Sequence, residues 1–253
     1  MSTQALFPTL VYTARLRGRG WQALNARLLR ECRQLRADDA AGRRWSARNY
    51  SGGYTSYGSV NRMHRLSPTF AALARALDLR VARFARTLAF DLTGRALAMT
   101  DCWVNIMGRG DAHGAHLHPL STISGTYYVA TPARSAGLKF EDPRLERYMA
   151  APPRLANARR ARAPWVLVAV STGAVGCSRA GCGTRYPPTK PPLSASASAS
   201  ITAGFSALAA MRPGTVNPYI EDALHDGRTL ASARVRIQQP FSVRRPRSEA
   251  KET

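Results

Sequence analysis

Apolar residues recur at helical spacing in two stretches of the N-terminal part of the chain. The first stretch begins at Trp21, and arginines fill its opposite face. The second begins at Ser67-Pro68, a cap residue followed by a first-turn proline. We therefore predict two amphipathic helices, separated by a loop at the Gly- and Ser-rich segment 50–57. Their apolar positions are Leu24, Leu28, Leu29 and Leu35 in the first helix, and Phe70, Leu73, Leu77, Val81, Phe84 and Leu88 in the second.

After Gly94 the pattern changes from helical to extended. Short apolar runs separated by Gly and Pro turns predict antiparallel strands packed as a sandwich or jelly roll. An earlier segment, 6–15, also alternates, and Pro8 restricts it to an edge or to the start of a strand. The predicted fold class is therefore α+β, with a helical N-terminal layer on a double-stranded β-helix (jelly roll). The later strands are expected at 103–107, at 116–118, at 127–130, at 137–140 and at 165–170.

The chain changes character near Gly176. From there to Phe205 we find no apolar periodicity, and a Ser-Ala repeat makes the segment look like low-complexity sequence. A jelly roll has about eight strands, and only five or six can be counted before this point. We therefore expect the C-terminal strands of the predicted fold to be lost from the chain as written.

Composition and charge restrict the function classes only weakly. The 253 residues are 45% hydrophobic, enough for a core, and no apolar run is long enough to cross a bilayer. The N-terminus lacks the pattern of a secretory signal, and the four cysteines follow no disulfide framework, so we expect a cytoplasmic protein. The net charge of +22 comes almost entirely from arginines scattered along the chain. Since no basic stripe or recognition helix appears, nucleic acid is not the expected partner.

The motif His116-Leu117-His118-Pro119 carries the clearest chemistry. Histidines at i and i+2 of an extended strand point the same way, so both imidazoles can bind one metal ion. The alternative is an exposed pair without a metal. His113, in the preceding Gly-rich loop, is expected to face solvent or contact a substrate.

The stretch 103–144 resembles a family of bacterial and phage Fe(II)/2-oxoglutarate-dependent oxygenases. It contains H-x-H-P, then S-G-x-Y-Y, then F-x-D-P-R, in that order. The resemblance implies that His116 and His118 bind Fe(II). It also implies that Tyr128, or Tyr127 beside it, contacts the co-substrate 2-oxoglutarate, and that Asn105 lines the pocket. Such enzymes also use a distal histidine and a later arginine that binds 2-oxoglutarate, and neither is found where the family has it.

A change of reading frame can explain both losses. If the codons are read one nucleotide earlier, 176–189 can encode L-F-E-S-W-L-R-H-E-V-P-P-N and 193–205 can encode E-R-I-S-V-S-F-N-Y-G-W-F. These segments resemble the family's distal-histidine and arginine strands. The histidine codon straddles Gly183 and Thr184, and the arginine codon straddles Ser194 and Ala195. We infer a frameshift near residue 176.

Three segments follow from this interpretation. Residues 1–97 form an N-terminal strand and helices that support the core, residues 98–175 a partial jelly-roll core, and residues 176–253 an out-of-frame and largely disordered tail. We expect poor folding after Pro164 and a dioxygenase that is inactive or impaired, with an unidentified small-molecule or protein substrate and no membrane association. The alternatives are another jelly-roll metal protein of the cupin kind, using His113, His116 and His118, and a non-enzymatic basic protein that binds polyanions.

Overall fold

A computed structural model describes residues 2–118, 121–133, 135, 137–179, 184–186 and 198–209. Among these residues, no helix is both long enough and apolar enough to span a membrane. The expected strand at 6–15 forms as β1, and the two predicted helices form as α1 and α4. The first elements in chain order are β1 (Val11–Arg15), α1 (Trp21–Asp38), α2 (Ala40–Asn49), β2 (Tyr54–Thr55), α3 (Met63–Leu66) and α4 (Pro68–Thr87).

The helix ends follow from local chemistry. Ser67 caps α4 by accepting hydrogen bonds from the amides of Thr69 and Phe70, at 3.1 and 3.4 Å. Asp39 ends α1 and caps α2 by accepting from the Gly42 amide at 2.7 Å. The sequence pattern does not predict α2, which follows α1 directly.

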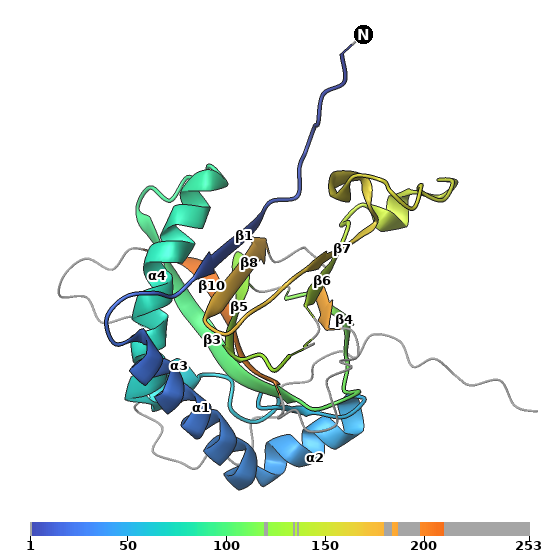
Figure 1. Cartoon of the computed structure of the whole chain (residues 1–253). Helices are drawn as coiled ribbons and strands as arrows, with labels where there is room; N and C mark the ends of the chain where they lie inside the picture. Colours follow the sequence, from blue (N-terminus) through green and yellow to red (C-terminus); the bar gives the residue numbers. More distant parts are fainter. Residues whose placement is uncertain are drawn as a thin grey trace, which may run out of the picture. The chain divides into compact units, whose positions relative to one another are not determined.

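The remaining elements are strands and two short 3₁₀ turns, and they form two antiparallel sheets (Figure 1). The larger sheet has the order β1-β8-β5-β10-β3-β2, and the smaller has the order β4-β9-β6-β7. As expected from Pro8, β1 lies at an edge. These elements are β3 (Arg95–Met107), β4 (His113–His116), β5 (Ile123–Ala130), β6 (Leu138–Glu141), the turns Leu145–Arg147 and Arg160–Arg162, β7 (Trp165–Val168), β8 (Ala174–Arg179), β9 (Thr184–Tyr186) and β10 (Ser198–Ala209).

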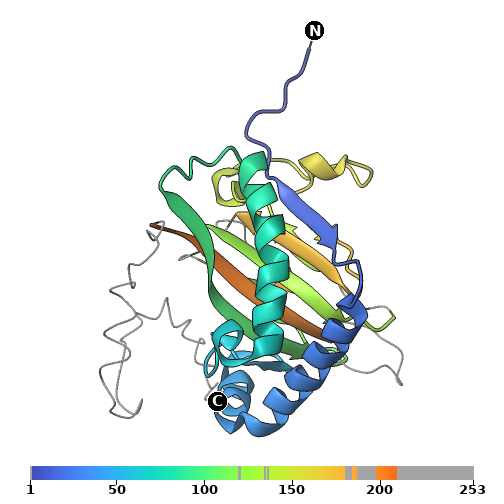
Figure 2. The same ribbon diagram turned by 90° about the vertical axis from the view of Figure 1, so that its left-hand side faces the viewer.

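The core lies between the larger sheet and the helices, and α4 runs across this outer face of the sheet (Figure 2). Alternate residues of each central strand point to it, as the two-residue period of a strand requires. A helical layer on a jelly roll, the predicted fold class, is confirmed. The fully buried core residues include Leu28, Phe70, Leu73, Phe84, Val104, Ile123, Tyr127, Ile201 and Phe205.

The expected loss of the C-terminal strands is wrong for the residues that the structure describes. β8 runs through the expected boundary at 175/176 and pairs with β1 and β5. β10 lies in the middle of the larger sheet, between β5 and β3. Chain after Pro164 is therefore folded at β7, β8, β9 and β10. Residues 210–253 and the expected arginine position at 194–195 lie outside the described residues.

The Ser-Ala repeat explains this error. In β10 the repeat places Ala199, Ile201, Ala203 and Phe205 on the core face, whereas Ser200 and Thr202 lie on the other face. Alternation of a methyl group with a hydroxyl is an amphipathic strand pattern of small residues. The segment that resembles low-complexity sequence thus satisfies the two-residue period of a strand.

Candidate metal and co-substrate site

The inner face of the larger sheet, which faces away from the helices, is polar. It carries buried side chains from four neighbouring strands, where burial of polar groups is unfavourable unless they have partners. A polar surface inside an otherwise apolar fold is where a ligand site is expected. Its buried polar residues are Asn105 on β3, Ser124, Thr126 and Tyr128 on β5, Ser178 on β8, and Ser200 and Thr202 on β10.

Three histidine rings lie together beside this face. His113 begins β4, His116 ends it, and His118 follows. The ring of His116 stacks on His113 with centroids 4.3 Å apart, and its centroid is 4.9 Å from that of His118. Leu117 between them is exposed, so the i and i+2 side chains do lie on one side as predicted.

Both candidate metal ligands have their Nε2 atoms available. The Nδ1 of His116 lies 2.9 Å from the carbonyl oxygen of Gly114, so it donates there and the lone pair is on Nε2. The Nδ1 of His118 contacts the Ser124 hydroxyl, while its Nε2 is buried without a hydrogen-bond partner among the described residues. Hydrogen bonds of this kind fix the orientation of metal-ligating imidazoles.

Burial also keeps these imidazoles neutral, the form that binds metal. Burial lowers the pKa of His118 to about 4, with a further contribution from His116. Burial also lowers the pKa of His116, although the hydrogen bond to the Gly114 carbonyl acts in the opposite direction and raises it. Both rings are therefore unprotonated at neutral pH.

His113 does not face solvent, which corrects one of the two expectations for it. Its side chain is buried and packs edge-on against Tyr50, with ring centroids 4.3 Å apart. Burial, followed by the neighbouring His116 and His118, lowers the pKa of His113 to about 3. Tyr50 belongs to the predicted Gly- and Ser-rich loop 50–57, so this loop packs against His113.

Aromatic residues that the sequence analysis missed enclose the histidines. Trp103 contacts His118 with ring centroids 5.4 Å apart, and Tyr57 packs on Trp103 at 5.1 Å. Trp45 of α2 packs against both Tyr50 and Tyr57. The only signal for this shell was the presence of three tyrosines in the loop 50–57, two of which pack here.

The two tyrosines of S-G-x-Y-Y point to opposite faces of β5. The hydroxyl of Tyr127 donates to Asn25 of α1 at 2.7 Å, so Tyr127 belongs to the helix side. Tyr128 lies on the polar inner face with Ser124, which contacts His118. Of the two candidates for a 2-oxoglutarate contact, Tyr128 alone faces the histidines' side of the sheet.

Asn105 lies on the same inner face, as expected for a pocket residue. Its Nδ2 donates to the Thr202 hydroxyl at 2.9 Å, which ties β3 to β10. Its Oδ1 is buried and accepts no hydrogen bond from the described residues. That oxygen is thus available to a ligand.

A third metal ligand beside His116 and His118 is not found among the residues that the structure describes. No three His, Cys, Asp or Glu side chains within the described part of the chain are placed to hold one metal ion. The three-histidine alternative, with His113 as a ligand, is therefore wrong for this arrangement. In the β4–β9 pairing, the residue opposite His116 is Thr184, at the position where the shifted frame encodes the distal histidine.

Comparison with known proteins agrees with the resemblance found on the sequence. Residues 101–176 match the family model described as "Putative 2OG-Fe(II) oxygenase". The resemblance to this family is thus confirmed over the segment that contains His116, His118 and Tyr128. The chain has no significant match among the curated proteins.

Two solved structures with TM-scores above 0.5 share this fold. AviO1 from Streptomyces viridochromogenes Tue57 matches with a TM-score of 0.52 and 14% identity, over 81% of this chain and 93% of that one. SnoN, a non-heme α-ketoglutarate-dependent epimerase from nogalamycin biosynthesis, matches with a TM-score of 0.51 and 16% identity, over 96% and 95%. A 2OG-Fe(II) oxygenase-family oxidoreductase from Burkholderia pseudomallei has a TM-score of 0.40 and 16% identity. That match covers 55% of this chain and 57% of the Burkholderia chain.

Proposed function

We propose that this chain is an Fe(II)/2-oxoglutarate-dependent dioxygenase of the hydroxylase type by descent, impaired by an incomplete metal site. The observation that carries the proposal is the family match over residues 101–176, which includes the paired histidines. The jelly roll of the larger and smaller sheets agrees with it. Iron and 2-oxoglutarate are the cofactor and co-substrate that the family implies.

The described residues fit part of such a site. His116 and His118 supply two neutral imidazoles whose Nε2 atoms are not used elsewhere. Iron of this class needs two histidines and a carboxylate, or an equivalent third protein ligand, on one face. A site with two of three ligands loses both bond energy and geometric constraint, so we expect weak metal binding and little turnover.

Some of the residues expected to contact 2-oxoglutarate are also in place. Tyr128 and Asn105 both lie on the polar inner face and are our candidates to contact 2-oxoglutarate. Tyr127 is assigned no such role, because its hydroxyl is bound to Asn25 on the helix side. The arginine that would pair with the far carboxylate of 2-oxoglutarate is absent from the frame as written.

A substitution in β9 tests whether a third metal ligand is missing at position 184. Directly opposed residues of antiparallel strands have side chains on the same face, so a histidine at 184 would lie beside His116. We expect Thr184→His to bind Ni²⁺ about tenfold or more tightly than the original chain, measured by titration calorimetry. Arg185→His is the matched control, because the next residue of a strand points to the opposite face. Equal affinities in the two variants would contradict the proposed third position.

The reading frame has its own test. Resequencing the coding DNA across codons 165 to 210 shows whether a base is missing. A restored base would return the distal histidine and the arginine strand, and the corrected protein should then couple 2-oxoglutarate decarboxylation to iron. Efficient coupling by the chain as written would contradict an impaired site.

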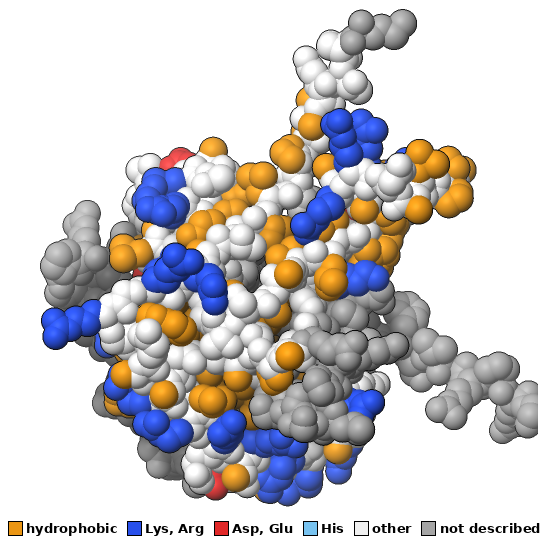
Figure 3. All heavy atoms as spheres, in the orientation of Figure 1, with side chains coloured by type: hydrophobic (Ala, Val, Ile, Leu, Met, Phe, Trp, Pro, Cys, Tyr) orange, Lys and Arg blue, Asp and Glu red, His pale blue; other side chains and the backbone are white. Residues whose placement is uncertain are grey.

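The substrate, a small molecule or a protein, and the cytoplasmic location stay predictions. Polyanion binding is the second candidate function, but no specific observation favours it. On the face shown in Figure 3, basic side chains are scattered among hydrophobic ones and form no continuous stripe. We therefore do not propose nucleic acid as the partner.

A further inference from the structure

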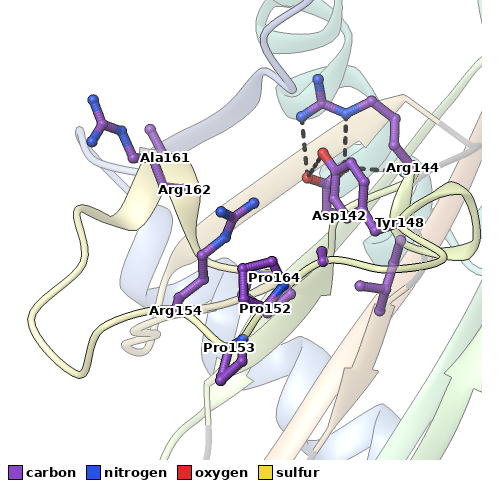
Figure 4. A pocket seen from close by; sticks show the side chains of 11 residues that line it. Asp142, Arg144, Tyr148, Pro152, Pro153, Arg154, Ala161, Arg162 and Pro164 are labelled. Atoms are coloured by element: carbon purple, nitrogen blue, oxygen red, sulfur yellow. Dashed lines mark hydrogen bonds and ion pairs between the residues drawn. The ribbon is translucent and has the colours of Figure 1, made fainter.

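The long connection between β6 and β7 encloses a pocket of about 450 Å³, separate from the histidines (Figure 4). Small-molecule sites usually have volumes of about 300–1,000 Å³. The F-x-D-P-R motif leads into this connection, and the oxygenase proposal gives that motif no role. We therefore asked what the pocket is built to hold.

A backbone hydrogen bond joins two residues that line the pocket. The amide of Asp142 donates to the carbonyl of Pro164 at 2.9 Å, which joins the two ends of the connection. Pro164 also lines the pocket, together with Pro152 and Pro153. Prolines fix the local backbone, so this apolar part of the lining is held without secondary structure.

One wall is a satisfied charged network. The carboxylate of Asp142 accepts from Arg144 Nε and Nη2 at 3.0 and 3.1 Å, and from the Tyr148 hydroxyl at 3.1 Å. The hydrogen bond from Arg144 is the main reason that the pKa of Asp142 is lowered. Asp142 is thus ionised and already fully engaged, and it is the one acidic residue among the described lining residues.

Two further arginines line the pocket without such a partner. Arg154 and Arg162 form no ion pair or side-chain hydrogen bond with any residue in the described ranges. In Figure 4 the guanidinium of Arg154 lies between Arg162 and the Asp142–Arg144 pair, while that of Arg162 extends outward, to the left of the view. Since residues 142–164 contain six arginines and two acidic residues, the positive charge here is not balanced.

We propose that this pocket binds a small anionic molecule, with a phosphate or carboxylate group on Arg154 and Arg162 and an apolar part against the prolines. A guanidinium matches both anions through paired N–H donors. The alternative is that both arginines are solvated side chains of an arginine-rich protein. Against this, both border one pocket that has an apolar lining and a neutralised acid. The proposal does not rest on the oxygenase function.

The test is a calorimetric titration of the full chain, in the presence of a metal chelator, with inorganic phosphate and separately with acetate. We expect saturable binding of at least one anion. The double variant Arg154→Gln/Arg162→Gln should weaken it about tenfold or more, since it removes the charge-assisted hydrogen bonds that both guanidiniums donate to the anion. The anion that saturates identifies the group recognised.

The matched control is Arg147→Gln/Arg159→Gln, which removes the same charge from two exposed arginines of the same connection that do not line the pocket. We expect it to change the affinity less than about twofold, with unchanged thermal unfolding in both double variants. Equal weakening in the two double variants, or no saturable binding of either anion, would overturn the proposal. Because the chelator removes metal, neither result bears on the oxygenase.

Discussion

The two faces of the larger sheet differ in polarity and in how far their side chains are matched by partners. The outer face is apolar, fully buried, and packed against α1 and α4, with Val104, Tyr127 and Phe205 among its residues. The inner face is polar. The Oδ1 atom of Asn105 on this face and the Nε2 atom of the nearby His118 are buried and have no hydrogen-bond partner among the described residues. Apolar packing therefore fills the outer face, whereas the inner face leaves polar atoms that a ligand could contact.

This difference separates what stabilises the protein from what it can catalyse. Apolar burial is non-directional and tolerates replacement by other apolar residues of similar size. A metal site instead needs particular atoms at particular places. Substitutions that keep alternate apolar residues in β8 and β10 can thus preserve a sheet even where they remove a metal ligand.

The largest expected effect is on the outer face of β10. Phe205→Ala should lower the free energy of unfolding by about 3–5 kcal/mol, because it leaves a cavity in the core. Phe205 is 1% exposed. Chemical denaturation measures the change. No loss of stability would mean that β10 does not lie in the sheet.

A smaller loss is expected on the inner face of the same strand. Thr202→Val keeps the shape but removes the hydroxyl that accepts from Asn105. The buried amide would then lack this partner, at a cost of about 1–3 kcal/mol in unfolding free energy. Thr202→Ser keeps the hydroxyl and should recover most of the loss, whereas equal losses would point to packing instead.

Neighbouring tyrosines of β5 sharpen the contrast between the faces. Tyr127→Phe removes the 2.7 Å hydrogen bond to Asn25 and should destabilise the fold by about 1 kcal/mol. A double-mutant cycle with Asn25→Ala isolates that bond. Tyr128→Phe leaves this contact in place, and its predicted effect is on 2-oxoglutarate binding. If Tyr128→Phe destabilised the fold and Tyr127→Phe weakened 2-oxoglutarate binding, the faces assigned to the two tyrosines would be wrong.

The smallest effect concerns pH and lies away from both faces. Burial raises the pKa of Asp39, but hydrogen bonds from Ser59, the Gly42 amide and Tyr54 outweigh it and hold the pKa below its usual value. This contribution to stability is present above the unfolded pKa of about 4 and is lost as pH falls through the lower folded value. Asp39 is partly exposed, so solvent screens its interactions and we expect about 0.5 kcal/mol or less.

The measurement is thermal unfolding between about pH 6 and pH 2.5. The original chain should lose slightly more stability over this range than Asp39→Asn, which keeps a good cap for α2. A steeper loss of stability in Asp39→Asn than in the original chain would mean that ionised Asp39 does not stabilise the fold.

Strong local signals in the sequence predicted much of the fold. The Ser67-Pro68 start and the apolar face of α4 were found because cap and period agree. The edge position of β1 followed from Pro8. β10 was missed because Ser and Ala differ little in hydrophobicity, so their alternation gives a weak signal although it satisfies the strand period.

The amino-acid sequence alone was enough to predict the fold class, the histidine pair and the family resemblance, because spacing and residue type are local properties of the chain. The folded structure was needed to show that Tyr128 rather than Tyr127 faces the inner side, that His113 is buried against Tyr50, and that Thr184 lies opposite His116. Strand pairing decides these points, since register sets which distant residues share a face. The pocket between β6 and β7 likewise depends on backbone contacts that join residues far apart in the chain.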